Sequence, residues 1–339
     1  VDTTSACPGT SLTFMDNSVP DHPLTGRLWD FGDGTTSTSQ NPTHVYSATG
    51  FYDVTLTVTN VYGCSESITK VQFVEILSPP TAQFTLSDTA GCVHFTLNLL
   101  NTSVGNSGIV SGILWDLCNC DSSTLNNSVI TYPTSGTYNI RLTVTEDNGC
   151  ISTATESIAV FDGPTASFFT NDVLGCPPHT VGFTNTSTGP ASIASYAWDF
   201  GVSGSSSTLP SPTFTYNDTG SYHVSLMVED VNGCRDTLVR TDFIQVREPQ
   251  ADFTTSSTQL CEGERVTFMD ASTGDTTLVN WFWDFGDGNT AIGDTVQHTY
   301  TADGAYTVRL IIENVVGCRD TIERINFILV SRGPNAAFT

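Results

Sequence analysis

Four stretches of the chain alternate between apolar and polar residues with a period of two. In residues 52–58 the apolar positions are Tyr52, Val54, Leu56 and Val58, and the three positions between them are polar. The same apolar positions recur in residues 138–144, 222–228 and 306–312. Because successive side chains of a strand point to opposite faces, this period predicts four long antiparallel strands, each with one buried face.

A shorter alternation precedes each long strand. It places two apolar residues on one face, at Leu12 and Phe14, Leu97 and Leu99, Val181 and Phe183, and Val266 and Phe268. Each of these strands ends in Asp or Asn with a Ser two residues later, at Asp16, Asn101, Asn185 and Asp270. Because such a side chain accepts a hydrogen bond from the backbone two residues on, we expect each strand to end in a turn.

These strands belong to a unit of roughly 85 residues that occurs four times. Each unit has a Trp-Asp pair, a Tyr two residues after a Gly, and two cysteines. The Trp-Asp pairs are Trp29-Asp30, Trp115-Asp116, Trp198-Asp199 and Trp283-Asp284. The tyrosines are Tyr52, Tyr138, Tyr222 and Tyr306. A fixed period over the whole chain indicates an array of like domains, each large enough for its own core.

The Trp-Asp pairs carry a family resemblance. Residues 29–34 and 283–288 read Trp-Asp-Phe-Gly-Asp-Gly, which resembles the signature of PKD domains. The downstream His44-Val-Tyr46 and Gly50-Phe-Tyr52 fit as well. The second repeat departs from the motif, with Leu-Cys-Asn-Cys after its Trp-Asp, and so does the third, with Phe-Gly-Val-Ser. The resemblance implies sandwiches that serve as spacer or interaction modules in secreted hydrolases, surface-layer proteins and large bacterial adhesins.

We therefore predict an all-β chain of four tandem immunoglobulin-like (PKD-type) β-sandwiches in an elongated array. The predicted repeats are residues 1–78, whose first strand is missing, 79–162, 163–247 and 248–332, followed by the first strand of a further repeat at 333–339. A Pro-x-Ala-x-Phe sequence begins each repeat after the first, at residues 80–84, 164–168, 249–253 and 334–338. Because no flexible Gly/Ser tract separates the repeats, a semi-rigid rod is expected.

The charge and the lengths of the apolar runs limit which partners and which cellular location the chain can have. The formal net charge is −24, and Lys70 is the only lysine. Binding to nucleic acid or to anionic lipid requires a basic face, so both are excluded as partners. No apolar run reaches the roughly 18 residues of a membrane span, and no signal peptide is visible. An extracellular or cell-surface location then implies that the chain is a processed or excised part of a larger precursor.

Eight of the ten cysteines follow the repeat. Cys7, Cys92, Cys176 and Cys261 open the units, and Cys64, Cys150, Cys234 and Cys318 follow at separations of 57, 58, 58 and 57 residues. These equal spacings predict one disulfide within each repeat, Cys7–Cys64, Cys92–Cys150, Cys176–Cys234 and Cys261–Cys318, in an oxidising compartment. Zinc is the weaker alternative, because no Cys-x-x-Cys or paired His accompanies them.

Cys118 and Cys120 replace the glycine turn of the second repeat. The favoured interpretation is a small local disulfide between them that pins the turn. A bridge to a neighbouring chain is the second interpretation, and metal or redox chemistry is the third.

Acidic side chains supply the candidate ligands. Asp30 and Asp33, and likewise Asp284 and Asp287, lie close together around turns, and carboxylate oxygens suit calcium. The favoured interpretation is that the Asp after Trp caps its turn, because two repeats lack the second Asp. Calcium at a junction, through Asp88, Asp162, Asp172 or Glu248, stays open. No other cofactor is predicted.

Asp-Thr pairs recur along the chain and are similar to the O-glycosylation motif of secreted Bacteroidota proteins. The acceptor threonines would be Thr3, Thr89, Thr237, Thr276, Thr295 and Thr321. Ordinary turn chemistry explains the pairs equally well. Asn-x-Ser/Thr sequons at Asn101, Asn126, Asn185 and Asn217 are weaker candidates.

No catalytic constellation is present in the sequence: it has no Gly-x-Ser-x-Gly, no HExxH and no phosphate-binding glycine loop. His44 and His298 stand where other repeats have Ile130 and Phe214, which indicates a packing role. We expect a structural or adhesive segment of an extracellular bacterial surface fibre that joins copies of itself, or flanking repeats of one chain, head to tail. Surface glycans or proteins would be further partners. Accessory modules of a secreted hydrolase are the alternative.

The Pro-x-Ala-x-Phe sequences leave two interpretations of that joining. Residues 334–338 repeat the sequence that the first repeat lacks. Either the chain is a window on a longer continuous array, which is favoured, or this strand completes the first repeat of the next molecule by donor-strand addition.

Overall fold

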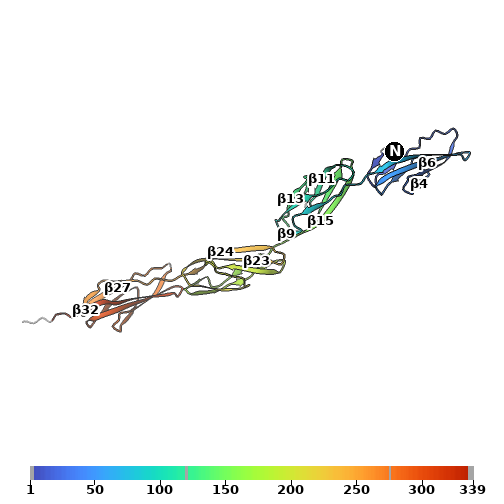
Figure 1. The fold of residues 1–339 in the computed structure, drawn as a ribbon. Helices are drawn as coiled ribbons and strands as arrows, with labels where there is room; N and C mark the ends of the chain where they lie inside the picture. Colours follow the sequence, from blue (N-terminus) through green and yellow to red (C-terminus); the bar gives the residue numbers. More distant parts are fainter. Residues whose placement is uncertain (1–3, 119–120, 275, 335–339) are drawn as a thin grey trace, which may run out of the picture. The chain divides into compact units, whose positions relative to one another are not determined.

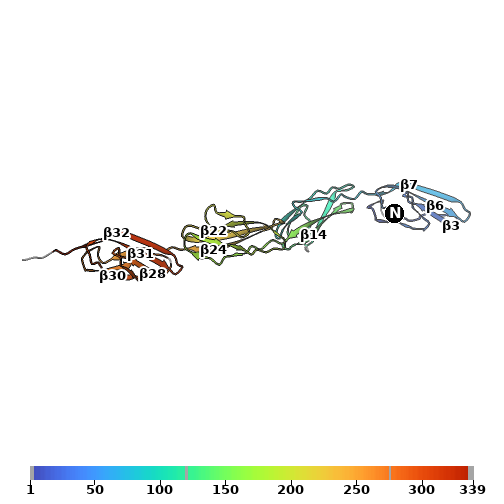
Figure 2. The same ribbon diagram turned by 90° about the horizontal axis from the view of Figure 1, so that it is seen from below.

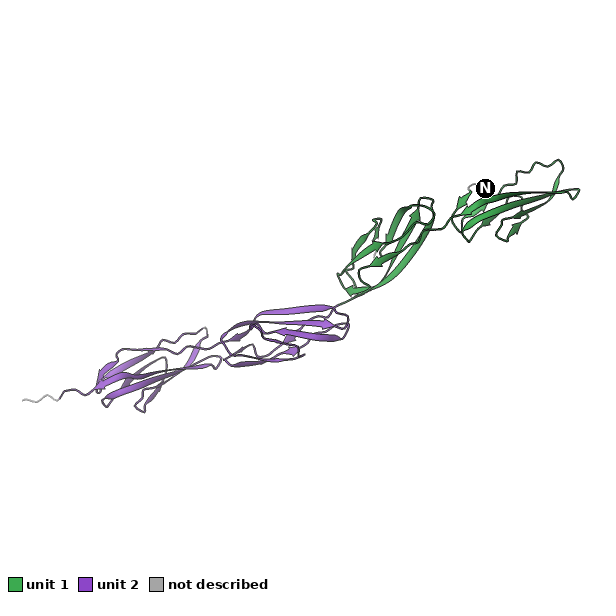
Figure 3. Cartoon of the chain, in the orientation of Figure 1, with its two compact units in different colours: residues 1–162 green, residues 163–339 purple. Residues whose placement is uncertain are grey.

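The structure is a computed structural model that describes residues 4–118, 121–274 and 276–334. The described residues form strands, turns and bends, and none of them is helical. In the same ranges no helix is long and apolar enough to cross a membrane. Two compact units divide the chain, residues 1–162 and residues 163–339 (Figure 3).

The first repeat is a five-stranded sheet facing a two-stranded one. The large sheet has the order β1-β7-β6-β3-β4, and the small sheet pairs β2 with β5. Figure 1 draws this repeat in blue, with β4 and β6 labelled. The strands are β1 (Ser5–Ala6), β2 (Ser11–Thr13), β3 (Leu24–Asp30), β4 (Thr36–Ser37), β5 (Thr43–Val45), β6 (Gly50–Asn60) and β7 (Ser65–Ile76).

The second repeat adds a strand to the small sheet. The large sheet is β12-β11-β14-β15-β9, and the small sheet is β13-β10-β8. The strands are β8 (Phe84–Leu86), β9 (Ala90–Cys92), β10 (Thr96–Asn101), β11 (Val110–Asp116), β12 (Ser122–Ser123), β13 (Ser128–Thr131), β14 (Gly136–Glu146) and β15 (Ile151–Phe161).

The third repeat follows the same plan. Its large sheet is β17-β24-β23-β20-β21, and its small layer is split into the pairs β16-β19 and β18-β22. The strands are β16 (Phe168–Phe169), β17 (Leu174–Gly175), β18 (His179–Gly182), β19 (Thr184–Asn185), β20 (Ile193–Asp199), β21 (Ser206–Ser207), β22 (Thr213–Tyr216), β23 (Gly220–Asp230) and β24 (Arg235–Val246).

The fourth repeat has the sheets β26-β32-β31-β28-β29 and β25-β27-β30. Its long strands β31 and β32 run side by side (Figure 2). The strands are β25 (Phe253–Thr255), β26 (Gln259–Cys261), β27 (Arg265–Asp270), β28 (Leu278–Asp284), β29 (Thr290–Ile292), β30 (Thr295–Thr299), β31 (Gly304–Asn314) and β32 (Arg319–Ser331). The expected all-β, tandem immunoglobulin-like architecture is confirmed.

The predicted alternation places one core in each repeat. In the third repeat, Val224, Leu226 and Val228 on β23 are fully buried in one cluster with Trp198 and Phe200. The other three repeats have separate apolar clusters around Trp29, Trp115 and Trp283. Each sandwich therefore has its own apolar core, as the length of the repeat predicts.

Two tyrosines per repeat fix the corners. The buried hydroxyl of Tyr216 donates to the carbonyl oxygen of Phe200 at 3.2 Å, and the Tyr222 hydroxyl donates to the Asp218 carbonyl at 2.7 Å. The second bond, four residues back along the chain, is a tyrosine corner of the kind found in immunoglobulin-like sandwiches. Tyr46, Tyr132 and Tyr300 repeat the first bond, and Tyr52, Tyr138 and Tyr306 repeat the second.

The predicted turn after the short strand is confirmed in all four repeats. Asp16 accepts a hydrogen bond from the Ser18 amide at 2.9 Å. Asn101, Asn185 and Asp270 make the same contact with the Ser two residues on, at 3.0, 2.9 and 3.0 Å.

One strand in each repeat was not predicted. A short segment that ends at the first cysteine, or one residue before it, pairs in parallel with the end of the last strand: β1 with β7, β9 with β15, β17 with β24, and β26 with β32. The position of these segments fixes where the first cysteine of each repeat lies.

A Tyr216→Phe variant tests the buried tyrosine bonds. Removing the hydroxyl leaves the Phe200 carbonyl without its partner, so the third repeat should lose about 1–2 kcal/mol of stability. Hydrogen exchange of residues 213–230, followed by mass spectrometry, measures the change. Tyr62→Phe is the control, because the Tyr62 side chain is exposed. Equal exchange rates in Tyr216→Phe and the parent would contradict the role given to the hydroxyl.

Candidate functional site

In each of the two compact units, residues 1–162 and 163–339, a disulfide joins the two repeats. Cys7 in the first repeat is bonded to Cys150 in the second, and Cys176 in the third is bonded to Cys318 in the fourth. The Cα atoms are 5.4 Å apart in both bonds, and the sequence separations are 143 and 142 residues. The first cysteine of one repeat therefore pairs with the second cysteine of the next.

The predicted bonds within single repeats, Cys7–Cys64 and Cys176–Cys234 among them, are wrong. The last strand of each repeat supplies the reason. In the second repeat, Cys150 precedes β15, whereas Cys92 is opposite Phe161 at the far end of the same strand. An 11-residue strand spans about 35 Å at roughly 3.3 Å per residue, whereas a disulfide requires Cα atoms within about 7 Å.

The same geometry governs Cys261 and Cys318. Cys261 is opposite Ser331 at the end of β32, and Cys318 precedes the start of that strand. Cys261–Cys318 is therefore not formed. In the first and third repeats the far end of the last strand leads into the repeat that follows, and Cys7 and Cys176 bond to the second cysteine of that repeat instead of the one in their own.

The remaining cysteines of the repeat fall into two groups. Cys92 and Cys234 are disulfide-bonded, whereas Cys64 and Cys261 are free thiols. Bonding and burial go together: Cys150, Cys234 and Cys318 are buried, but their equivalent Cys64 is exposed.

The predicted local bridge in the second repeat is also wrong, because Cys118 is a free thiol; Cys120 lies outside the described residues. Cys118 has a φ of 59° and stands where the other repeats have Gly32, Gly201 and Gly286 with φ between 77° and 79°. A Cβ on those glycines would be about 2.4 Å from a carbonyl oxygen of the neighbouring strand. In the second repeat the Cys118 thiol instead donates to the equivalent carbonyl, that of Asn139.

The acidic residues after each Trp cap turns. Asp30, Asp199 and Asp284 accept hydrogen bonds from the amide two residues on at 2.9, 2.9 and 3.0 Å, and Asp116 does so at 3.3 Å. Across the described ranges no three His, Cys, Asp or Glu side chains gather into a group that could hold a metal. The observed bonds favour the turn-capping interpretation of these carboxylates over calcium binding.

The second Asp of the motif pairs with a histidine. Asp33 Oδ2 is 2.7 Å from His44 Nε2, and Asp287 Oδ2 is 2.8 Å from His298 Nε2. His44 also stacks on Phe31, with ring centroids 4.2 Å apart, as His298 does on Phe285 at 4.1 Å. The packing role predicted for the histidines is confirmed, and the bond to Asp was missed.

The sequence carried a signal for this pair. At the position of His44 and His298, His occurs only in the two repeats that keep the second Asp, whereas in the third repeat Val202 replaces the Asp and Phe214 replaces the His. Phe214 stacks on Phe200 at 4.5 Å, in the manner of the two histidines.

Burial alone would raise the pKa of Asp287. Hydrogen bonds from Asn289 and His298 outweigh burial, and the pKa lies below its ordinary value of 3.8. The pKa of Asp33 is lowered in the same way, with burial opposed by Thr35 and His44.

The other predicted ligand and glycosylation residues do not gather into a site in the described part of the chain. Asp162 accepts a hydrogen bond from Ser135, and Asp172 lies 3.6 Å from His179, whereas Asp88 and Glu248 are exposed. Of the threonines, Thr89, Thr237, Thr295 and Thr321 are exposed, Thr276 is partly buried, and Thr3 lies outside the described residues.

Two aspartates of the Asp-Thr pairs have a structural role that was missed. Asp236 accepts a hydrogen bond from the Ala166 amide at 2.7 Å, and Asp320 from the Ala251 amide at 2.6 Å. Both alanines belong to Pro-x-Ala-x-Phe sequences, so these carboxylates anchor the segment that begins each repeat. The shared sequence Cys-Arg-Asp-Thr at 234–237 and 318–321 was the available signal.

An Asp287→Asn variant tests the Asp–His pair through pH. Because the pKa of Asp287 is lowered on folding, the carboxylate stabilises the fold above pH 3.8, and the contribution is lost as the pH falls through the folded value. The stability difference between parent and Asp287→Asn should therefore be full at neutral pH and shrink below about pH 4. Urea unfolding followed by tryptophan fluorescence measures it.

The matched control is Asp21→Asn, which changes an exposed carboxylate. A difference between Asp287→Asn and the parent that stays constant from neutral to acidic pH would refute the account.

Known proteins are similar to this chain in sequence. A family model described as "PKD domain" matches residues 1–76, 162–246 and 246–328. The pre-pro-metalloprotease PrtV of Vibrio cholerae is 30% identical over 141 residues, which are 41% of this chain and 15% of PrtV. A microbial collagenase of Vibrio alginolyticus is 42% identical over 71 residues, 20% of this chain and 9% of the collagenase. The chain thus spans 15% or less of these relatives.

Among solved structures, the PKD1 domain of the Vibrio cholerae metalloprotease PrtV is 31% identical. It covers 24% of this chain and 98% of its own length, with a TM-score of 0.23. The family model covers more than half of the sequence, and the matched repeats carry the capped Trp-Asp turn and the paired tyrosines. The chain belongs to the PKD domain family.

Proposed function

We propose that this chain is a structural segment of an extracellular bacterial surface fibre, in which disulfides hold successive PKD domains as a semi-rigid spacer. The observation that carries the proposal is the pairing of Cys7 with Cys150 and of Cys176 with Cys318 across repeat boundaries. A module that had only to fold would be stabilised by a bond within itself. A bond between modules resists their separation and bending.

The chain entropy removed by these disulfides supports the same function. Closing a loop of about 140 residues removes roughly 5 kcal/mol of chain entropy from the unfolded state in the loop-closure model. Because each bond joins cysteines of two sandwiches, it couples the unfolding of one sandwich to that of the other. Such coupling suits a part that carries load. Disulfides also require an oxidising compartment, which supports an extracellular location.

The junction has polar contacts in addition to the disulfide. The Asn106 side chain donates to the Pro79 carbonyl at 2.6 Å, and the Ser107 hydroxyl accepts from the Ser78 amide at 2.8 Å. Glu146, which is buried, holds the same loop by accepting from the Asn106 amide at 2.6 Å. These bonds tie the segment that leaves the first repeat to a loop of the second.

A second function is favoured by the relatives, which are named as a metalloprotease and a collagenase. In this alternative the repeats are accessory modules of a secreted hydrolase, and catalysis is carried by a domain elsewhere. Binding of the chain to insoluble collagen would favour the alternative. The fibre function requires no such binding.

Small-angle X-ray scattering tests the spacer function. The oxidised 339-residue chain is compared with the Cys7→Ser/Cys150→Ser double variant, and Cys64→Ser is the control because Cys64 is a free thiol. The double variant should show a broader distribution of intramolecular distances, whereas Cys64→Ser should match the parent. Identical distributions in the double variant and the parent would show that the bond does not restrain the junction.

A further inference from the structure

The disulfides decide which residues carry tension when the two ends of the chain are pulled apart. In a stretched chain, tension is carried by the shortest covalent route between the points of attachment. Cys7–Cys150 and Cys176–Cys318 close loops with sequence separations of 143 and 142 residues. The shortest route, here called the loaded path, therefore skips both loops and consists of residues 1–7, 150–176 and 318–339.

The second repeat carries tension on a strand that is already extended. The loaded path enters the repeat at Cys150 and runs along β15, whose 11 residues span about 35 Å at roughly 3.3 Å per residue. A chain reaches at most about 3.6 Å per residue, so stretching could lengthen this strand by only about 3 Å. The pull lies along the strand, so its pairing with β14, from Gly136 opposite Val160 to Thr145 opposite Ile151, is loaded together.

The third repeat carries tension on the segment that begins it. The Ala166 amide donates to Asp236, the second residue of β24, at 2.7 Å, and Gly175 is opposite Val246, the last residue of β24. Residues 166–175 thus run beside β24 over nearly its whole length. Because this segment covers the strand with no more residues than the strand itself uses, it is extended and holds little slack.

The fourth repeat carries tension on its last strand. Cys318 precedes β32, and the loaded path runs along all 13 residues of that strand. The pull again lies along the strand, which has β26 on one side and β31 on the other. In the second, third and fourth repeats the loaded path is therefore extended before any sandwich unfolds.

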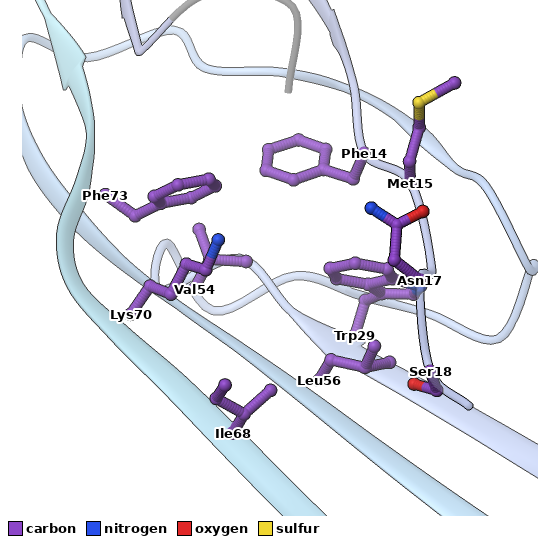
Figure 4. Close-up of a pocket in the computed structure, with 10 residues that line it drawn as sticks. All are labelled: Phe14, Met15, Asn17, Ser18, Trp29, Val54, Leu56, Ile68, Lys70 and Phe73. Atoms are coloured by element: carbon purple, nitrogen blue, oxygen red, sulfur yellow. The ribbon is translucent and has the colours of Figure 1, made fainter. Parts of the chain in front are cut away.

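The core of the first repeat lies almost entirely outside the loaded path. Figure 4 shows Trp29, Val54, Leu56 and Phe73 of that core around one pocket. All four belong to residues 8–149, which the first disulfide closes into a loop. If this core unfolds while the disulfide is intact, the released residues stay inside the loop and add no length between the two ends.

We infer that the disulfides make the chain a tension line of limited length, in which the sandwiches can unfold without lengthening it. Subtracting the separations of 143 and 142 from 339 residues leaves a loaded path of about 54 residues. Fully stretched at ~3.6 Å per residue, this path reaches about 200 Å, whereas the same chain without disulfides reaches about 1,200 Å. Cys92 and Cys234 lie inside the skipped loops, so their bonds leave this limit unchanged.

The inference rests on the proposed fibre function and deepens it by naming the property that bonds between repeats give to a fibre under tension. Bonds within single repeats would limit the length less. Four loops of 57 or 58 residues would leave a loaded path of about 109 residues, which reaches about 400 Å. Pairing between repeats halves that limit because each loop takes in parts of two sandwiches.

Optical tweezers test the inference on the oxidised 339-residue chain, pulled through DNA handles that are joined enzymatically to peptide tags at its two ends. After subtraction of the tags, the stretched length at high force should be about 200 Å. A dithiol added at high force gives each disulfide two electrons and two protons and is itself oxidised to a disulfide. The stretched length should then rise about sixfold, to about 1,200 Å.

Two double variants separate the contributions of the two bonds. Cys7→Ser/Cys150→Ser and Cys176→Ser/Cys318→Ser each reopen one loop, so each variant should stretch to about 600 Å or more, roughly three times the parent. Cys64→Ser is the control and should match the parent, because Cys64 is a free thiol.

A parent chain that stretches to about 400 Å, or to about 1,200 Å before the dithiol is added, would overturn the inference. The first length would place the bonds within single repeats, and the second would show that they are absent. The scattering comparison measures a separate property, the restraint on the junction at rest. A parent that stretches to about 200 Å while scattering finds no restraint keeps the tension line and refutes the spacer. A parent that stretches beyond about 600 Å while scattering finds the restraint does the reverse.

Discussion

The long last strand of each repeat is the constraint on which the rest of the structure depends. The second cysteine of the repeat lies one residue before the start of this strand, and the first cysteine lies beside its far end. An extended strand of 11 to 13 residues keeps these two thiols too far apart to bond. Its far end also leads directly into the next sandwich. Because of this strand, the cysteines bond between repeats and not within them.

The Pro-x-Ala-x-Phe segment is the second element that crosses the boundary. It begins immediately after the last strand, and its phenylalanine is buried in the core of the repeat that follows, at Phe168 and Phe253 for example. An aspartate and an arginine of that repeat's own last strand hold it, through the Ala251 amide and the Phe253 ring in the fourth repeat. Core packing and the disulfide thus act on the same junction, one from inside the sandwich and one at its end.

Local chemistry was predictable from the sequence. Alternation gave the long strands, because a half-buried strand requires a period of two whatever its neighbours are. The turns after Asp16 and Asp270 were predictable because the Asp and the amide it binds are two residues apart. The recurrence of Trp and Tyr at fixed positions in four repeats marked them as structural residues, whereas the carbonyl partners of the tyrosine hydroxyls were not predicted.

The disulfide pairing was not predictable in the same way. A separation of 57 or 58 residues within a repeat and one of 142 or 143 between repeats are equally regular, so spacing alone cannot choose between them. The choice depends on the parallel pairing of short segments such as β9, which is too brief to leave a periodic signal. Likewise, the role of Asp236 depends on a contact with Ala166, 70 residues away.

Disulfide mapping of the oxidised monomer by mass spectrometry, without reduction and with free thiols alkylated first, tests the account most directly. Peptides containing Cys7 and Cys150 should be found linked, as should those containing Cys176 and Cys318, and Cys64 and Cys261 should carry the alkyl label. A Cys7–Cys64 or a Cys261–Cys318 linkage would contradict the account, because it would place the covalent bonds within single repeats and leave the repeats unjoined.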